Sequence, residues 1–177
     1  MRQTSSESSL VAHSPSAPDG PILECGGESG DNALRIHARR TFAVSREELF
    51  GAWTQRHALD TWLRLRSRSR VMLSPSMGGS LRLELSEGPT IHVITGVVVD
   101  VRPSEFLALS WVHQSNGDHT SSVSITFRER NRRGELTLLH SGIGNRREAA
   151  WLMHLWTKAL GRLAGYFAET TPLARSA

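Results

Sequence analysis

TIHVITGVVVDVRPSEFLALSWVH, residues 90–113, is the stretch that decides the fold of this chain. Residues 90–102 and 106–113 are rich in β-branched and aromatic side chains and alternate with the period of a strand, so each predicts one. Pro103 has a fixed φ and no backbone N–H, and it predicts a turn between them. In the first strand we expect one apolar face, formed by Ile91, Val93, Val97, Val99 and Val101.

The same alternation continues on both sides of this hairpin. We expect further strands at residues 34–44, 70–74, 80–86, 121–130 and 134–141. Turn residues separate them, namely Pro75 with Gly78 and Gly79, Gly88 with Pro89, Asn116 with Gly117, and Gly134. Because short turns join consecutive strands, the seven strands predict one antiparallel sheet.

Two short helices are expected after the first strand. Ser45 and Glu48 have the spacing of a capping box, in which each side chain satisfies the other residue's backbone amide. Leu49 and Trp53 then share an apolar face, and a second short helical stretch places Trp62 on a similar face.

A long helix is expected after Gly144, and Asn145 with Glu148 marks its start. One stripe of this helix is apolar and consists of Leu152, Leu155, Trp156, Ala159, Leu160, Leu163 and Phe167. The concave face of the sheet offers the apolar surface that this stripe needs as a cover. The predicted fold class is therefore α+β, with a seven-stranded curved antiparallel sheet wrapped around a long C-terminal helix.

Length and composition favour a single domain. The chain has 177 residues, 38% of them hydrophobic, which is too short for two domains of typical size. Residues 1–33 are rich in Ser, Pro, Gly and acidic residues and are predicted to form a flexible tail, followed by the domain at 34–170 and a short tail at 171–177. The single cysteine, Cys25, excludes an internal disulfide and a thiolate metal cluster. No apolar run suits a membrane span or a signal peptide, so we expect a soluble cytoplasmic protein.

Positive charge is carried almost entirely by arginine, since Lys158 is the one lysine among 21 basic residues. Arg64, Arg66, Arg68 and Arg70 alternate with leucine and serine, a pattern that suits either a solvated face or a surface for phosphates. No aromatic residue lies between these arginines and no nucleic-acid motif is near them. We therefore favour the solvated face and do not expect nucleic acid as a partner.

The order of one strand, two short helices, six strands and a long helix resembles the helix-grip fold of the START-like, or SRPBCC, superfamily. Within it, residues 34–169 resemble the family of homologues of the heat-shock-protein ATPase activator. The motifs that carry the resemblance are FGAWT at 50–54, MGGSLR at 77–82, GVVVDVRP at 96–103, FLALSW at 106–111 and LTLLHSG at 136–142. In that family a glycine often precedes the helix tryptophan, whereas here Leu155 precedes Trp156 and adds bulk against the sheet.

The resemblance implies a cavity between the long helix and the sheet that holds a small hydrophobic molecule. The residues expected to line it are Trp53, Trp62, Trp111, His113, Phe127, His140, Leu152, Trp156 and Leu160. The tryptophans serve equally well as core side chains, and that interpretation stays open. Trp151, at the edge of the helix stripe, marks either the mouth of a pocket or a contact between subunits.

His113 and His140 are the candidate catalytic residues, because strand alternation directs both inward among apolar neighbours. An inward imidazole can donate to a ligand or act as a general acid or base near neutral pH, and the alternative is a core imidazole bonded to the backbone. His92 is expected on the face opposite Ile91 and Val93, away from the apolar side. We therefore predict no metal site, and no cofactor is expected.

Three functions remain open. We favour a non-enzymatic protein that binds or carries a small, mostly apolar molecule. The first alternative is an enzyme of the cyclase or dehydratase kind that uses an inward histidine. The second is a protein-interaction module that contacts a chaperone through an outer face such as the arginines at 64–70. The pattern is also compatible with a homodimer.

Overall fold

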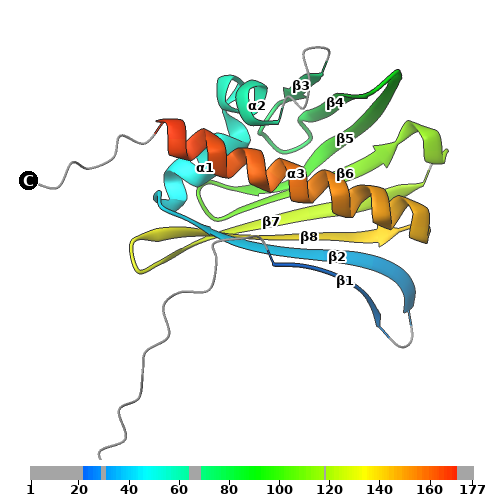
Figure 1. The fold of residues 1–177 in the computed structure, drawn as a ribbon, viewed down its shortest axis with the longest axis horizontal. Coiled ribbons are helices and arrows are strands. Elements are labelled where there is room, and N and C mark those ends of the chain that lie inside the picture. Colours follow the sequence, from blue (N-terminus) through cyan, green and yellow to red (C-terminus); the bar gives the residue numbers. More distant parts are fainter. Residues whose placement is uncertain (1–21, 29–30, 64–68, 118, 171–177) are drawn as a thin grey trace, which may run out of the picture.

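The computed structural model describes residues 22–28, 31–63, 69–117 and 119–170. Within these residues the fold is α+β, with a curved antiparallel sheet and a long C-terminal helix across it (Figure 1). The predicted fold class is therefore confirmed. Most of the predicted N-terminal tail and the predicted C-terminal tail lie outside the described residues.

The described part of the chain forms eight strands, three α-helices and one short 3-10 helix. The strands are β1 (Ile22–Glu28), β2 (Asp31–Phe42), β3 (Arg70–Leu73), β4 (Ser80–Glu87), β5 (Thr90–Arg102), β6 (Phe106–His113), β7 (Thr120–Arg130) and β8 (Arg133–Ile143). The helices are α1 (Arg46–Thr54), α2 (Arg56–Trp62), η1 (Gln114–Asn116) and α3 (Arg146–Thr170).

The sheet has the order β1-β2-β8-β7-β6-β5-β4-β3, and each neighbouring pair is antiparallel. Strands β3 to β8 follow one another as hairpins, and β2 joins the sheet beside β8. The expected count of seven strands is wrong, because residues 22–28, which we assigned to the tail, form the edge strand β1. Cross-strand hydrogen bonds to β2 form this edge despite a composition that predicts a flexible segment.

The predicted apolar face of β5 is also wrong. Ile91, Val97 and Val99 are about half exposed, whereas Ile94 and Val98 are buried. The reason is the pairing with β4, whose inward leucine Leu85 lies opposite His92, so the residues of β5 with even numbers face the core at this end. A register shift between Val98 and Asp100 then returns Val101 to the inner side.

The turn between β7 and β8 differs from the prediction. Asn131 and Arg132 have positive φ angles of 51° and 61° and form the turn, whereas Gly134 already belongs to β8. Gly134 is required for another reason, since a Cβ atom there would lie 3.0 Å from the backbone oxygens of Val44 and Ser45. The glycine therefore allows the start of α1 to approach the sheet closely.

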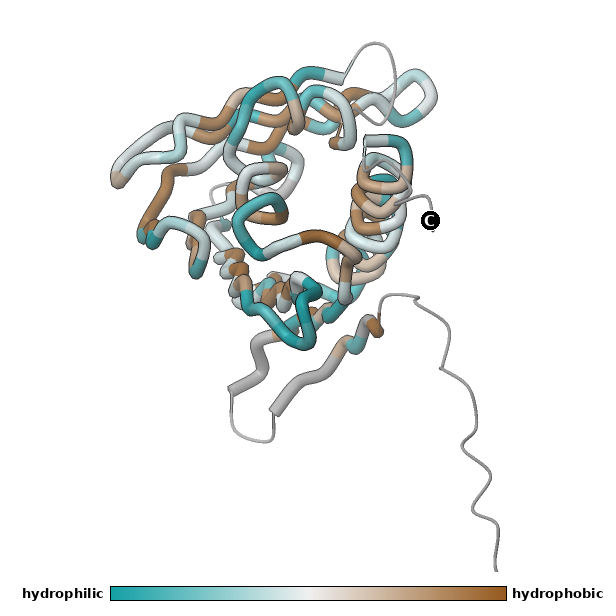
Figure 2. The backbone as a smooth tube through the Cα atoms, turned by 90° about the vertical axis from the view of Figure 1, so that its left-hand side faces the viewer, coloured by the Kyte–Doolittle hydropathy of each residue, from teal (hydrophilic) through white to brown (hydrophobic). Residues whose placement is uncertain are grey.

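The long helix α3 lies on the concave side of the sheet, as the end-on view in Figure 2 shows. Every residue of the predicted apolar stripe is buried, and the stripe belongs to the same core cluster as inward side chains of the sheet. At the helix start, the backbone N–H of Glu148 donates to Asn145 Oδ1 at 2.9 Å, and the Glu148 carboxylate accepts from the backbone N–H of Gly144 at 3.1 Å. The predicted cap is thus present, with the glutamate reaching one residue further back.

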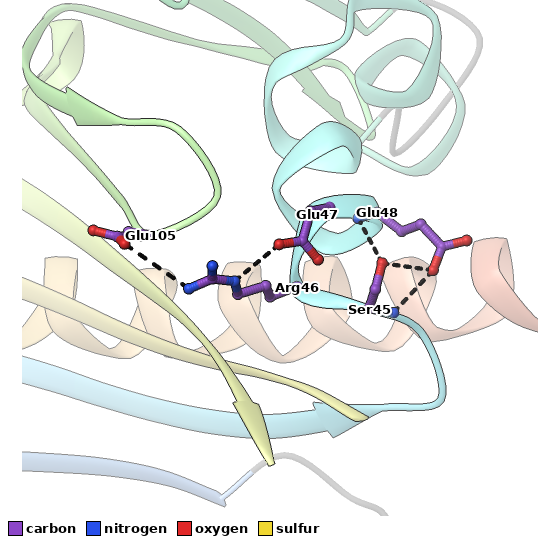
Figure 3. Close-up of polar contacts among 5 residues, drawn as sticks. All are labelled: Ser45, Arg46, Glu47, Glu48 and Glu105. Atoms are coloured by element: carbon purple, nitrogen blue, oxygen red, sulfur yellow. Dashed lines mark hydrogen bonds and ion pairs between the residues drawn. The ribbon is translucent and has the colours of Figure 1, made fainter. Parts of the chain in front are cut away.

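The capping box at the start of α1 is confirmed (Figure 3). Ser45 Oγ accepts from the backbone N–H of Glu48 at 3.2 Å, and the Glu48 carboxylate accepts from the backbone N–H of Ser45 at 2.9 Å. Arg46 next to this cap contacts Glu47 and lies 3.9 Å from Glu105 in the turn between β5 and β6. The cap therefore ends β2 and begins the helical segment that leads to the opposite edge of the sheet.

Replacement of the cap side chain tests this role. We expect Ser45→Ala to lower the free energy of unfolding by about 1 kcal/mol, because the backbone N–H of Glu48 loses its acceptor and the Glu48 carboxylate loses the hydroxyl of Ser45. Urea denaturation measures the change. Glu47→Ala removes an exposed carboxylate of the same turn that takes no part in the box, and it should change the stability by less than about 0.5 kcal/mol. Equal losses in the two variants would contradict the assigned role.

Candidate functional site

A pocket of about 350 Å³ opens between α3 and the strands β4 and β5, and we call it the outer pocket. Its lining combines apolar side chains with polar and charged ones. The residues are Leu85, Ser86, Glu87, His92, Trp151, His154, Leu155, Lys158 and Arg162. Five of them come from one face of α3, since their spacing follows the helical repeat.

A second, much smaller space lies deeper, and we call it the inner cavity. It has a volume of about 20 Å³. Its wall consists of eight leucines, one valine and three tryptophans, namely Leu59, Leu63, Leu73, Leu81, Leu83, Leu85, Leu109, Leu155, Val71, Trp53, Trp111 and Trp156. Leu85 and Leu155 line both spaces, so these two side chains form the partition between them.

Trp151 lies at the mouth of the outer pocket, which is one of the two positions expected for it. Its ring stacks on His113 with the centroids 4.7 Å apart and the planes at 2°. Its indole N–H donates to Glu87 Oε2 at 3.3 Å, which joins α3 to the end of β4. The tryptophan is therefore held on the wall by one ring contact and one hydrogen bond.

His92 and His113 are brought together, contrary to the expected outward position of His92. Nδ1 of His92 lies 3.2 Å from Nε2 of His113, and Nε2 of His92 lies 3.4 Å from the Glu87 carboxylate. The pairing of β5 with β4 sets this position, because it places His92 opposite the inward Leu85 and so turns it toward the inner side. Burial lowers the pKa of His113, the neighbouring imidazole of His92 lowers it further, and the charge of Glu148 opposes both.

His140 is fully buried and both of its ring nitrogens are engaged. The indole N–H of Trp156 donates to Nδ1 at 3.2 Å, so the proton of the neutral ring lies on Nε2, which is 2.8 Å from Ser121 Oγ. The Ser121 hydroxyl in turn donates to the carbonyl of Trp111 at 3.2 Å. Burial lowers the pKa of His140 to about 3, so the ring is neutral near pH 7. This arrangement favours the core role that the sequence left open.

The other predicted site residues divide into two groups. Trp53, Trp111 and Trp156 line the inner cavity, and His113 borders the mouth of the outer pocket through its stack with Trp151. The residues that are buried but line neither space are Trp62, Phe127, Leu152 and Leu160. Three of the four predicted arginines, Arg64, Arg66 and Arg68, lie outside the described residues, and Arg70 is exposed on β3.

Sequence reasoning missed most of the outer pocket. His154, Lys158 and Arg162 were not predicted as site residues, although they follow Trp151 at intervals of three to four residues along α3. That spacing was the available signal, because it places them on the same helix face as Trp151. Glu87 and Ser86, at the end of β4, became recognisable only once the register with β5 was known.

The helix-grip class is defined by a curved antiparallel sheet around a long C-terminal helix. Two short helices after the first strand of the grip, here β2, belong to the same class. Residues 43–168 match the family described as "Activator of Hsp90 ATPase homolog 1-like protein". The chain therefore belongs to this family. Among curated proteins, no sequence matches it.

Solved structures confirm the fold. CalU16 from Micromonospora echinospora is 18% identical, with a TM-score of 0.62 over 84% of this chain and 85% of that chain. MLL2253 from Mesorhizobium loti is 23% identical, with a TM-score of 0.64 over 77% of this chain and 98% of that chain. PFC0360w from Plasmodium falciparum, described as an HSP90 activator, is 20% identical, with a TM-score of 0.53 over 63% and 75%. At these identities the likeness concerns the fold alone.

Two features are absent from the described residues. None of their helices is long and apolar enough to cross a membrane. No group of three or more His, Cys, Asp or Glu side chains in these residues is arranged to hold a metal ion.

The buried His140 predicts how stability depends on pH. Its pKa of about 3 lies below the ordinary value of 6.5. Between these two values, His140 binds a proton in the unfolded chain but not in the folded chain. The contribution of the neutral His140 to the free energy of unfolding is complete above about pH 6.5. It is lost as the pH falls, at a slope of about 1.4 kcal/mol per pH unit. Chemical denaturation between pH 7 and 4, in steps of about one unit, measures this slope.

His140→Gln should flatten this pH dependence, because an amide does not titrate in the range. His57→Gln is the matched control, since His57 is exposed on α2 and its removal should leave the slope unchanged. If wild type and His140→Gln lost stability in parallel, the buried imidazole would not be the cause.

Proposed function

We propose that this chain binds one small, mostly apolar molecule in the outer pocket and that it does so without catalysing a reaction. The observation that supports this function is the open pocket of about 350 Å³ between α3 and the sheet, whose inner wall is Leu85 and Leu155. This volume lies in the range of about 300–1,000 Å³ that is usual for small-molecule sites. Trp151 adds a rigid aromatic surface at the mouth.

The rim favours a negatively charged end on this molecule. Lys158 is exposed on the rim and has no ion-pair partner among the described residues. The guanidinium of Arg162 donates to the backbone carbonyls of Thr61 and Trp62, so it joins α3 to α2 and adds positive charge to the same rim. Glu87, the carboxylate of this pocket, already accepts from Trp151. A carboxylate or sulfate on the ligand would therefore form an ion pair with the Lys158 ammonium.

The non-catalytic character is supported by the histidines. Both nitrogens of His140 are engaged within the core, and His92 lies between His113 and Glu87. His92, His113 and His140 thus each have protein partners. Binding requires only the apolar wall and the rim charge.

Two related dyes test the rim charge. Anilinonaphthalenesulfonate carries a sulfonate, and phenylnaphthylamine is its neutral counterpart. We expect each dye to bind with a stoichiometry of one. Lys158→Met should lower the affinity for the sulfonate dye about fivefold to tenfold and leave the affinity for the neutral dye unchanged. Fluorescence titration measures both affinities. Arg147→Met removes an exposed cation of the same helix outside the pocket and should affect neither dye. Binding of several dyes per chain, or equal losses for both variants, would contradict the proposal.

Leu155→Ala tests the partition. Removal of this side chain should join the outer pocket to the inner cavity, and phenylnaphthylamine should bind about fivefold more tightly because more of it is buried. The free energy of unfolding should fall by about 2–5 kcal/mol. Leu163→Ala, on the same buried stripe but away from both spaces, should cost similar stability with no gain in affinity. A gain in both variants would indicate general loosening of the core instead.

A further inference from the structure

The five tryptophans differ in whether their indole N–H finds an acceptor. The N–H groups of Trp62, Trp151 and Trp156 donate to Ala52 O, Glu87 Oε2 and His140 Nδ1. Trp53 and Trp111 are only 4% and 2% exposed, and their N–H groups are buried with no acceptor among the described residues. Folded proteins rarely leave buried donors in this condition, so these two require an explanation.

Both of these tryptophans line the inner cavity. Apart from tryptophan, the side chains of the cavity wall are leucine and valine, which offer no acceptor. An acceptor that reaches these donors must therefore enter from outside the wall. The cavity volume of about 20 Å³ is sufficient for a single oxygen atom or one water molecule and for little more.

The partition gives the route of entry. Leu155 and Leu85 separate the inner cavity from the outer pocket, so a rotamer change of one of these side chains lets the end of a bound ligand reach the indoles. A carbonyl oxygen suits this position, because its two lone pairs can accept from two N–H groups while the rest of the ligand stays in the apolar surroundings.

We propose that the inner cavity is a subsite for a carbonyl oxygen, which the indole N–H groups of Trp53 and Trp111 recognise. The proposal rests on the proposed function and narrows the ligand class to an apolar molecule with a ketone, ester or amide group at the end that enters first. The site should prefer a carbonyl group to a hydrocarbon, because a hydrocarbon in the same place would leave both N–H donors buried without an acceptor, which costs free energy.

Acetophenone and isopropylbenzene test this specificity, because acetophenone has a carbonyl oxygen where isopropylbenzene has a methyl group. Indole N–H resonances in a proton–nitrogen correlation spectrum report each tryptophan separately. We expect the resonances of Trp53 and Trp111 to lie upfield of those of Trp62 and Trp156 in the free protein. Acetophenone should move at least one of the two downfield, and isopropylbenzene should move neither.

Affinity gives a second measure. Acetophenone should bind about tenfold more tightly than isopropylbenzene. Replacement of Trp111 by benzothienylalanine, which keeps the ring shape and lacks the N–H, should reduce this ratio about threefold to tenfold. The same replacement at Trp62, whose donor is already paired with Ala52, should leave the ratio unchanged.

The outcomes separate the two proposals. If the probes shift only the Trp151 resonance, the outer pocket binds and the carbonyl subsite is refuted. If the Trp53 and Trp111 resonances are already downfield in the free protein and stay there with acetophenone, a bound water satisfies them and the subsite is again refuted. If no resonance moves and neither dye binds, the proposed function itself fails.

Discussion

The apolar stripe of α3 must be covered, and the concave face of the sheet covers it. This contact places Trp156 beside His140 and Trp111, and it buries one stripe of a helix of 25 residues. Every other feature of the interior follows from it. Tryptophan and leucine side chains fill the centre between the helix and the sheet, and the outer pocket opens beside β4 and β5.

The interior is therefore neither an open barrel nor a solid core. A partition of two leucines, Leu85 and Leu155, separates a nearly filled apolar centre from a pocket with a charged rim. The rigid network of Trp156, His140 and Ser121 fixes the far wall of this space. Walls of defined shape suit selective binding of a small molecule, which is the function that we propose.

Much of this architecture could be predicted from residue patterns. The bounds of β5 and β6, the capping box and the buried stripe of α3 each depend on local chemistry, and each was found as expected. The inward face of β5 could not be read in the same way, because both of its faces carry valine or isoleucine and only the pairing with β4 decides between them. The meeting of His92 with His113 depends on that pairing, and the outer pocket depends on contacts between α3 and β4 that no local pattern encodes.

The position of a bound probe tests the account most directly. A crystal structure of the protein soaked with phenylnaphthylamine should show one molecule between Trp151 and Leu155, with its apolar end toward the partition. Density for the probe solely on the outer face of the sheet, or a space between α3 and β4 closed by side chains, would contradict the account and transfer the function to the exterior of the molecule.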